Sequence, residues 1–143
     1  MGLLNEKIFH NLFVNIGDKQ MVFKVLIVDD DYINRILLVS LLKKQLYKIE
    51  ALESVDGRDA LNMCKQHPDI QLILLDIEMP NMDGVEFLLE YKKDKSLPQV
   101  PIITVSSNDL RAKEVLSLGS SAFIVKPVTE DKLLSSIRQV QKF

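Results

Sequence analysis

The sequence predicts a doubly wound α/β domain, in which five parallel strands alternate with helices. Short apolar runs, rich in Ile and Val, recur from Phe23 onward, and a segment with apolar residues three and four positions apart follows each run. Parallel strands need crossover connections, which are almost always right-handed, so helices are expected on both faces of the sheet. A length of 143 residues suffices for one such core, and a second independent core is not expected.

The five expected strands are the apolar runs themselves, at residues 24–28 (KVLIV), 48–51, 71–75 (QLILL), 101–105 (PIITV) and 122–125 (AFIV). Four of them are apolar on consecutive residues and too short for helices, which is typical of strands buried on both faces of a parallel sheet. The run at 48–51 is weaker and is predicted to be an edge strand.

Each expected helix has one apolar face for the sheet. The residues assigned to these faces, helix by helix, are Ile33, Ile36, Leu37 and Leu41; Ala60, Leu61 and Cys64; Val85, Leu88 and Leu89; Ala112, Val115 and Leu116; and Leu133, Leu134, Ile137 and Val140. Asp31 is expected to cap the first helix and Thr129 the last, while Pro68 and Gly119 mark helix ends. These segments form one domain at residues 23–143.

Residues 1–22 lie outside this repeat and are interpreted as an N-terminal extension. Five apolar residues fall on one helical stripe and favour a short amphipathic helix: Ile8, Phe9, Leu12, Phe13 and Ile16. One interpretation is a linker or the tail of an upstream domain. The other is a dimerising or docking helix, and only the dimerising form would give a homodimer.

The composition narrows the classes of function. A formal charge of −2 gives no electrostatic footprint for nucleic acid, so this chain alone is not expected to bind it. No apolar run approaches the roughly 18 residues of a membrane span, so no membrane insertion is expected. Cys64 is the single cysteine and is expected to be a buried hydrophobic residue, and the absence of an intrachain disulfide favours a reducing compartment, the cytoplasm.

Polar residues follow the central strands directly, at the edge where ligands bind in open parallel sheets. Asp29 and Asp30 follow the first run, Asp76 the third, Ser106 the fourth and Lys126 the fifth. Taken alone, each has an ordinary explanation as a turn former, a cap or a surface charge. Because parallel strands bring these ends to one edge, we expect the residues to converge.

Converging carboxylates repel one another unless a cation lies among them. Oxygen ligands without His or Cys suit a hard ion, and Mg²⁺ uses one or two carboxylates together with phosphate oxygens. A carboxylate at Asp76, with Mg²⁺, Lys126 and the Ser106 hydroxyl around it, has the groups needed to accept a phosphoryl group as an acyl phosphate.

Four stretches, VLIVDDD, LILLDIEMPNMDG, PIITVSS and AFIVKP, resemble the response-regulator receiver domains in order and spacing, over about residues 23–142. The resemblance implies a CheY-like, flavodoxin-like fold with strand order 2-1-3-4-5. It implies a Mg²⁺ site formed by Asp30, Asp76 and the main-chain carbonyl of Glu78, with Asp29 helping through water. The run DDDYINRILL followed by LLKK is similar to receivers of hybrid sensor histidine kinases, although a free-standing regulator remains the alternative.

The resemblance also implies a role in two-component signal transduction. Asp76 would accept the phosphoryl group from a phosphohistidine on a sensor histidine kinase or a histidine phosphotransfer protein, and Lys126, joined to Pro127 by a cis peptide bond, would contact it. The Ser106 hydroxyl would then move toward the phosphoryl oxygens and Phe123 would turn inward, changing the surface around the fourth helix and fifth strand.

Two other classes were weighed against this switch. A degenerate receiver that only binds partners is disfavoured by the joint presence of the acids, Ser106 and Lys126. The third class is an aspartate-nucleophile phosphatase or a nucleotide-binding protein. The phosphatase would want a second Asp two residues after Asp76, where Glu78 stands. The nucleotide-binding protein would want a glycine-rich phosphate loop, and none follows the first strand. The prediction is therefore a phosphoacceptor domain that catalyses only its own phosphorylation and slow dephosphorylation, with Glu78 and Asn108 at positions that tune the phosphoryl lifetime in the family.

Overall fold

The computed structural model describes residues 22–46 and 48–140, which form an α/β domain around one parallel sheet. The strands are β1 (Phe23–Val28), β2 (Ile49–Ser54), β3 (Leu72–Asp76), β4 (Ile102–Ser106) and β5 (Ala122–Val125), in the order β2-β1-β3-β4-β5. The predicted fold class and strand order are confirmed. Residues 1–21 of the expected N-terminal extension lie outside the described residues.

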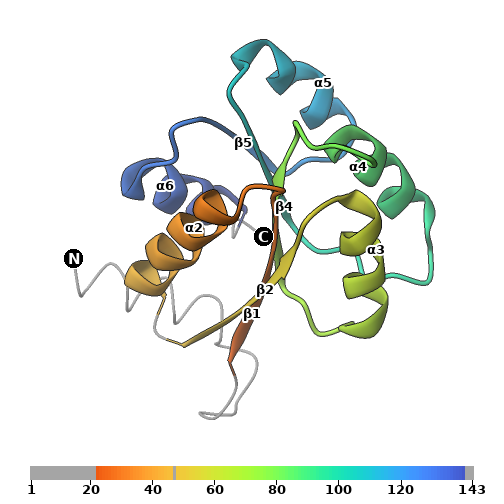
Figure 1. The fold of residues 1–143 in the computed structure, drawn as a ribbon, viewed down its shortest axis with the longest axis horizontal. Coiled ribbons are helices and arrows are strands. Elements are labelled where there is room, and N and C mark those ends of the chain that lie inside the picture. Colours follow the sequence, from red (N-terminus) through yellow and green to blue (C-terminus); the bar gives the residue numbers. More distant parts are fainter. Residues whose placement is uncertain (1–21, 47, 141–143) are drawn as a thin grey trace.

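Helices cover both faces of the sheet. They are α2 (Tyr32–Gln45), α3 (Gly57–Gln66), α4 (Gly84–Lys93), α5 (Ala112–Ser117) and α6 (Glu130–Val140), with a short 3-10 turn, η1 (Asp109–Arg111), before α5. Figure 1 shows α2 and α6 on one side of the sheet and α3, α4 and α5 on the other. This is the arrangement that right-handed crossovers produce.

The strands divide the core into two parts, because successive side chains point to opposite faces. In β1, Val25 and Ile27 pack on the side of α2 and α6, whereas Leu26 and Val28 pack on the side of α3, α4 and α5. Both sets are fully buried. The consecutive apolar residues of the central strands thus reflect a sheet that is covered twice.

The prediction that four strands are buried on both faces is wrong for β5. β5 is the second edge strand of the sheet, paired only with β4, and Phe123 and Val125 are only partly buried. The run at 48–51 was predicted to be an edge strand, and this is correct. The strand it forms, β2, continues to Ser54.

The apolar face assigned to the first helix is correct for Leu41 but wrong for its other three residues. In α2, Ile33, Ile36 and Leu37 are 68%, 46% and 47% exposed, and the buried residues are Leu38, Leu41, Leu42 and Gln45. The sequence of α2 is apolar on more than one stripe, so spacing alone allowed two solutions. The same ambiguity made the predictions for α4 and α5 wrong at one residue each. Leu89 and Leu116 were assigned to the faces against the sheet, but both are exposed.

The predicted caps are confirmed. The Asp31 carboxylate accepts a hydrogen bond from the Ile33 N–H at 2.9 Å, and the Thr129 hydroxyl accepts one from the Lys132 N–H at 3.2 Å. Gly119 has a φ of 110°, a conformation that glycine adopts without strain, directly after α5. Cys64 is buried, as expected.

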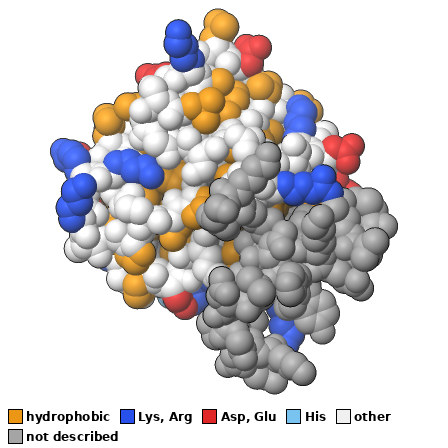
Figure 2. Space-filling model, turned by 180° about the vertical axis from the view of Figure 1, so that it is seen from behind, with side chains coloured by type: hydrophobic (Ala, Val, Ile, Leu, Met, Phe, Trp, Pro, Cys, Tyr) orange, Lys and Arg blue, Asp and Glu red, His pale blue; other side chains and the backbone are white. Residues whose placement is uncertain are grey.

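Figure 2 shows the face opposite to that of Figure 1, where hydrophobic side chains are exposed in several separate groups among white and charged surface. In the part of the chain that the structure describes, no helix is long and apolar enough to cross a membrane.

Candidate functional site

The strand register brings the predicted site residues to one edge of the sheet. Val28 at the end of β1 pairs with Leu75, one residue before Asp76, and Asp76 itself pairs with Val105, one residue before Ser106. Ser106 pairs in turn with Val125, directly before Lys126. Residues far apart in the sequence therefore come together because each strand ends at the same level.

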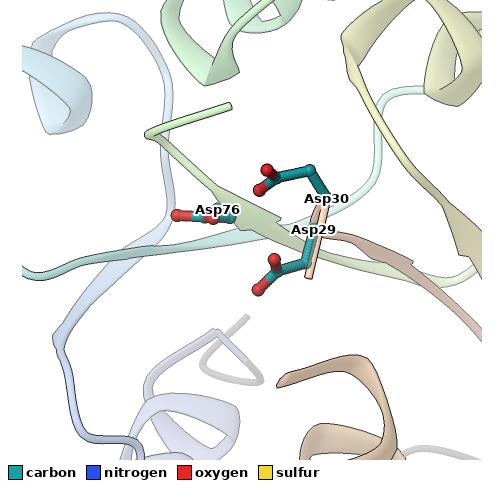
Figure 3. A group of neighbouring side chains, drawn as sticks. All are labelled: Asp29, Asp30 and Asp76. Carbon is teal, nitrogen blue, oxygen red and sulfur yellow. The ribbon is translucent and has the colours of Figure 1, made fainter. Parts of the chain in front are cut away.

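Three carboxylates cluster at this edge. Carboxylate oxygens of Asp29, Asp30 and Asp76 all lie within 4.8 Å of one another. Figure 3 shows Asp29 and Asp30 leaving the end of β1 beside Asp76 at the end of β3. Asp29 and Asp76 are 2% and 4% exposed, whereas Asp30 faces solvent, so the cluster is a buried pair with one accessible acid.

Lys126 supplies a positive charge to this cluster. Its Nζ lies 3.4 Å from Asp76 Oδ1. The Lys126 N–H donates to the carbonyl of Ser106 at 2.9 Å, which ties the start of the following segment to β4, and the Lys126–Pro127 peptide bond is cis.

Burial dominates the electrostatics of the two inner acids. Burial, and next the charge of Asp29, raise the pKa of Asp76 from 3.8 to about 7, against the lowering effect of Lys126. Burial also raises the pKa of Asp29. Both carboxyl groups are therefore costly to ionise together, and one lysine does not remove that cost.

The residues fit a hard divalent cation. The cluster offers three carboxylates and contains no nitrogen or sulfur ligand, a donor set that suits Mg²⁺. A cation among the carboxylates would offset the repulsion that raises the pKa of Asp76. Asp30, being exposed, gives such an ion contact with water, which Mg²⁺ retains in protein sites.

The loop between β3 and α4 is packed closely against the backbone at the end of β3. A Cβ atom at Gly84 would lie 2.7 Å from the carbonyl oxygen of Asp76 and 2.7 Å from Ile77 Cα, so only glycine fits there. Asp83 caps α4 in a capping box with Glu86. The sequence reasoning assigned no role to these residues, although an Asp with a Glu three positions later is a recognisable helix start.

Ser106 is buried at the end of β4 and hydrogen-bonded to the loop after β3. Its hydroxyl donates to Glu78 Oε2 at 2.7 Å and accepts from the Asn108 N–H at 3.0 Å. The expected role of Glu78 concerned its main-chain carbonyl, and the contacts of its side chain were not foreseen. Phe123 is partly buried against the core on the side of α3, α4 and α5.

A cavity of about 370 Å³ opens beside the cluster, between α2 and the segment after β5. Leu37, Leu38 and Pro127 line it, and Asp29 and Lys126 border it. A partly apolar hollow therefore lies next to Asp29 and Lys126.

The fold and the site together define an open, doubly wound α/β domain with an acidic cluster and a lysine at the carboxyl edge of its sheet. The family model "Response regulator receiver domain" matches residues 25–138, and the chain belongs to this family.

The curated relatives that the chain matches are also named as response regulators. The chain is 32% identical over 106 residues to the two-component response regulator ORR7 of rice, covering 73% of this chain and 50% of that protein. It is 32% identical over 126 residues to the response regulator PleD of Caulobacter vibrioides, covering 86% of this chain and 27% of that protein. The chain thus spans half or less of the length of these two relatives.

Among solved structures, the chain resembles one in the crystal structure of the CheX–CheY–BeF₃–Mg²⁺ complex from Borrelia burgdorferi. The TM-score is 0.74 at 31% identity, covering 82% of this chain and 88% of that one. The chain is accordingly a response-regulator receiver domain of two-component signalling.

Proposed function

We propose that Asp76 accepts a phosphoryl group from a phosphohistidine on a sensor histidine kinase or a histidine phosphotransfer protein. The observation that carries the proposal is a buried carboxylate within 4.8 Å of two other acids and 3.4 Å from the Lys126 ammonium group. The resemblance to a chain crystallised with BeF₃ and Mg²⁺ supports it.

In the proposed reaction, a carboxylate oxygen of Asp76 attacks phosphorus and forms a P–O bond. The P–N bond of the donor breaks, its electron pair returns to the imidazole ring, and Asp76 becomes an acyl phosphate. Mg²⁺, held by Asp30, Asp76 and the main-chain carbonyl of Glu78 with Asp29 nearby, would supply positive charge opposite the phosphoryl oxygens.

The chain's own residues position the reactants. Lys126 balances charge at the carboxylate, and the N–H of Glu78 donates to Asp76 Oδ1 at 3.3 Å, which orients the acceptor. The Ser106 hydroxyl would bind a phosphoryl oxygen after transfer. Phe123, only partly buried in the present structure, would turn inward and change the surface around α5 and β5.

The cavity beside the acids is the proposed docking place for the phosphodonor, because it is bordered by Asp29 and Lys126. Its apolar lining from α2 and Pro127 suits a partner surface, while Asp29 and Lys126 lie where the phosphoryl group would enter. Residues 1–22 are proposed to be an extension outside the reaction, so their deletion should leave phosphorylation unchanged. A change in oligomeric state on deletion would instead identify them as a docking helix.

The test is incubation of the full chain with Mg²⁺ and a small donor, acetyl phosphate or phosphoramidate, followed by intact-mass measurement. We expect a phosphate-sized gain that requires Mg²⁺ and is abolished by Asp76→Asn but kept by Asp109→Asn, which removes an exposed acid of η1. If the folded protein gains no mass with either donor, the domain is a binding module and the proposal fails.

A further inference from the structure

The side chain of Glu78 meets three hydrogen-bond donors or cations beside the acceptor. Its carboxylate accepts from the Ser106 hydroxyl at 2.7 Å and from the Ser107 N–H at 3.3 Å. Arg111 Nη1 lies 3.5 Å from Glu78 Oε2. One oxygen faces the hydroxyl and the other faces the amide, so the carboxylate spans two consecutive residues at the end of β4.

These two donors stand next to the phosphoacceptor. Asp76 pairs with Val105 in the sheet, and Ser106 and Ser107 follow directly, while the Glu78 N–H is bonded to Asp76 itself. Two adjacent donors at this position offer a site for two oxygens of an anion. In the present structure the anion there is the Glu78 carboxylate.

We propose that Glu78 occupies, in the unphosphorylated protein, the donors that the phosphoryl group on Asp76 must gain, and so competes with it. The proposal rests on the phosphoacceptor function above. Glu78 is on this account a positioning residue: it holds the Ser106 hydroxyl away from Asp76 until the phosphoryl group displaces it. Two anions cannot share the same pair of donors without strong repulsion, so the carboxylate and the phosphoryl group compete for them.

Arg111 provides a place for the displaced carboxylate. Its Nε is bonded to Glu114 Oε1 at 3.0 Å while its Nη1 faces Glu78, so it bridges the loop after β3 and helix α5. The side chains of Glu78 and Arg111 are 41% and 29% exposed, so the carboxylate can move toward Arg111 without being buried. Movement of Glu78 would thereby reach α5, the helix after β4.

The competition can be measured with beryllium fluoride and Mg²⁺, a stable phosphoryl analogue that binds a carboxylate oxygen without a donor. Glu78→Ala frees both donors, so the analogue no longer has to displace a carboxylate from them. The apparent affinity for the analogue should rise roughly three- to thirtyfold, which is the net free energy of about one charge-assisted hydrogen bond. Glu78→Gln keeps an acceptor oxygen but no charge, so its gain should be smaller than that of Glu78→Ala.

Two controls separate this effect from general changes. Glu114→Gln removes a different carboxylate that also contacts Arg111 but not Ser106, and it should leave the affinity unchanged. All titrations are run at saturating Mg²⁺, established separately for each variant, so that altered metal binding does not enter. A merely structural role of Glu78 would weaken binding in the alanine variant, the opposite direction.

A second readout is the amide signal of Ser107 in ¹H–¹⁵N spectra. Glu78→Ala should shift this signal in the free protein but leave it at the wild-type position in the beryllofluoride-bound protein, where the carboxylate has already left. If Glu78→Ala binds the analogue no more tightly than the wild type, and the wild type does gain phosphate mass, the proposed competition is overturned and the phosphoacceptor function remains. A wild-type protein that neither gains phosphate nor binds the analogue overturns both.

Discussion

Asp76→Asn should stabilise the domain in metal-free buffer above neutral pH. Asp76 is 4% exposed, and its pKa is raised from 3.8 to about 7 by burial and by the charge of Asp29. Asn has nearly the same shape and removes the charge. Both contacts of the carboxylate, with the Glu78 N–H and with Lys126 Nζ, are made by Oδ1, so the amide oxygen of Asn can keep them.

The sign follows from proton linkage. Below 3.8 both the folded and the unfolded chain hold the Asp76 proton, and the raised pKa has no effect on stability. Between 3.8 and about 7 only the folded protein holds it, so the free energy of unfolding falls as pH rises, and above about 7 the full loss is present.

The size of the effect is set by the pKa shift. At about 1.36 kcal/mol per pH unit, the shift corresponds to about 4 kcal/mol as an upper limit. Relaxation and water near the site raise the effective dielectric constant, so we expect a gain of about 1–3 kcal/mol for Asp76→Asn at pH 8. For a domain of this size the melting temperature would rise by about 3–5 °C per kcal/mol.

The assay is urea unfolding at pH 8 and pH 5 in EDTA, repeated with Mg²⁺. The advantage of Asp76→Asn should be largest at pH 8 in EDTA and smaller at pH 5, and Mg²⁺ should reduce it by stabilising the wild type. Asp109→Asn, on the exposed surface, should change stability by less than about 0.5 kcal/mol at either pH. An Asp76→Asn protein that is no more stable than the wild type at pH 8, or equally stabilised at both values, would refute the account of a repulsive, buried cluster.

Three further changes test the loop and the countercharge. Asp83→Ala removes the side-chain half of the capping box, the carboxylate that accepts from the Glu86 N–H, and should lower the free energy of unfolding by about 1–2 kcal/mol in urea, without altering the pH dependence assigned to Asp76. Gly84→Ala places a methyl group against the backbone of Asp76 and Ile77 and should cost about 1–3 kcal/mol, and it should also slow phosphorylation, read from the intact-mass time course. Lys126→Met keeps most of the side-chain volume but removes the charge 3.4 Å from Asp76. It should slow phosphorylation by about tenfold or more at equal Mg²⁺.

The strands were predictable because a doubly covered sheet demands continuous apolar residues, which few other short segments show. The buried faces of the helices were less predictable than the strands. In α2 the sequence offers apolar residues on several sides, and only packing decides that Leu38 and Leu42 are buried whereas Ile33 and Ile36 are exposed. β5 reads as fully apolar but lies at an edge, because strand order is a property of the whole fold and not of the run itself.

The convergence of the site residues was predictable from the same rule, since parallel strands end at one edge and Asp29, Asp76, Ser106 and Lys126 follow or finish them. The contacts of long side chains were not predictable from that rule. Glu78 could have pointed to solvent, and its position depends on where Ser106 and Arg111 lie after folding. The spacing of these residues in the sequence does not predict such a contact. It joins the loop after β3 to the last residue of β4 and to residues that follow it.

The triplet Asp29, Asp30 and Asp31 shows why identical residue types at one position acquire different roles. Asp29 is fixed by its backbone: its N–H donates to the Ser54 carbonyl at 3.0 Å, and its own carbonyl accepts from Arg35 Nη1 at 2.7 Å. Its buried carboxylate lies within 4.8 Å of a carboxylate oxygen of Asp76. Where the strand ends, Asp30 turns outward to solvent beside the cluster.

Asp31 completes the turn by capping α2, and its N–H donates to Asp29 Oδ1 at 2.8 Å. That hydrogen bond lowers the pKa of Asp29 and opposes the effect of burial. One short turn thus both starts α2 and contributes to the electrostatics of the inner acid. Since α2 also carries Leu37 and Leu38 along the cavity, the same turn links the position of the acids to one wall of that cavity.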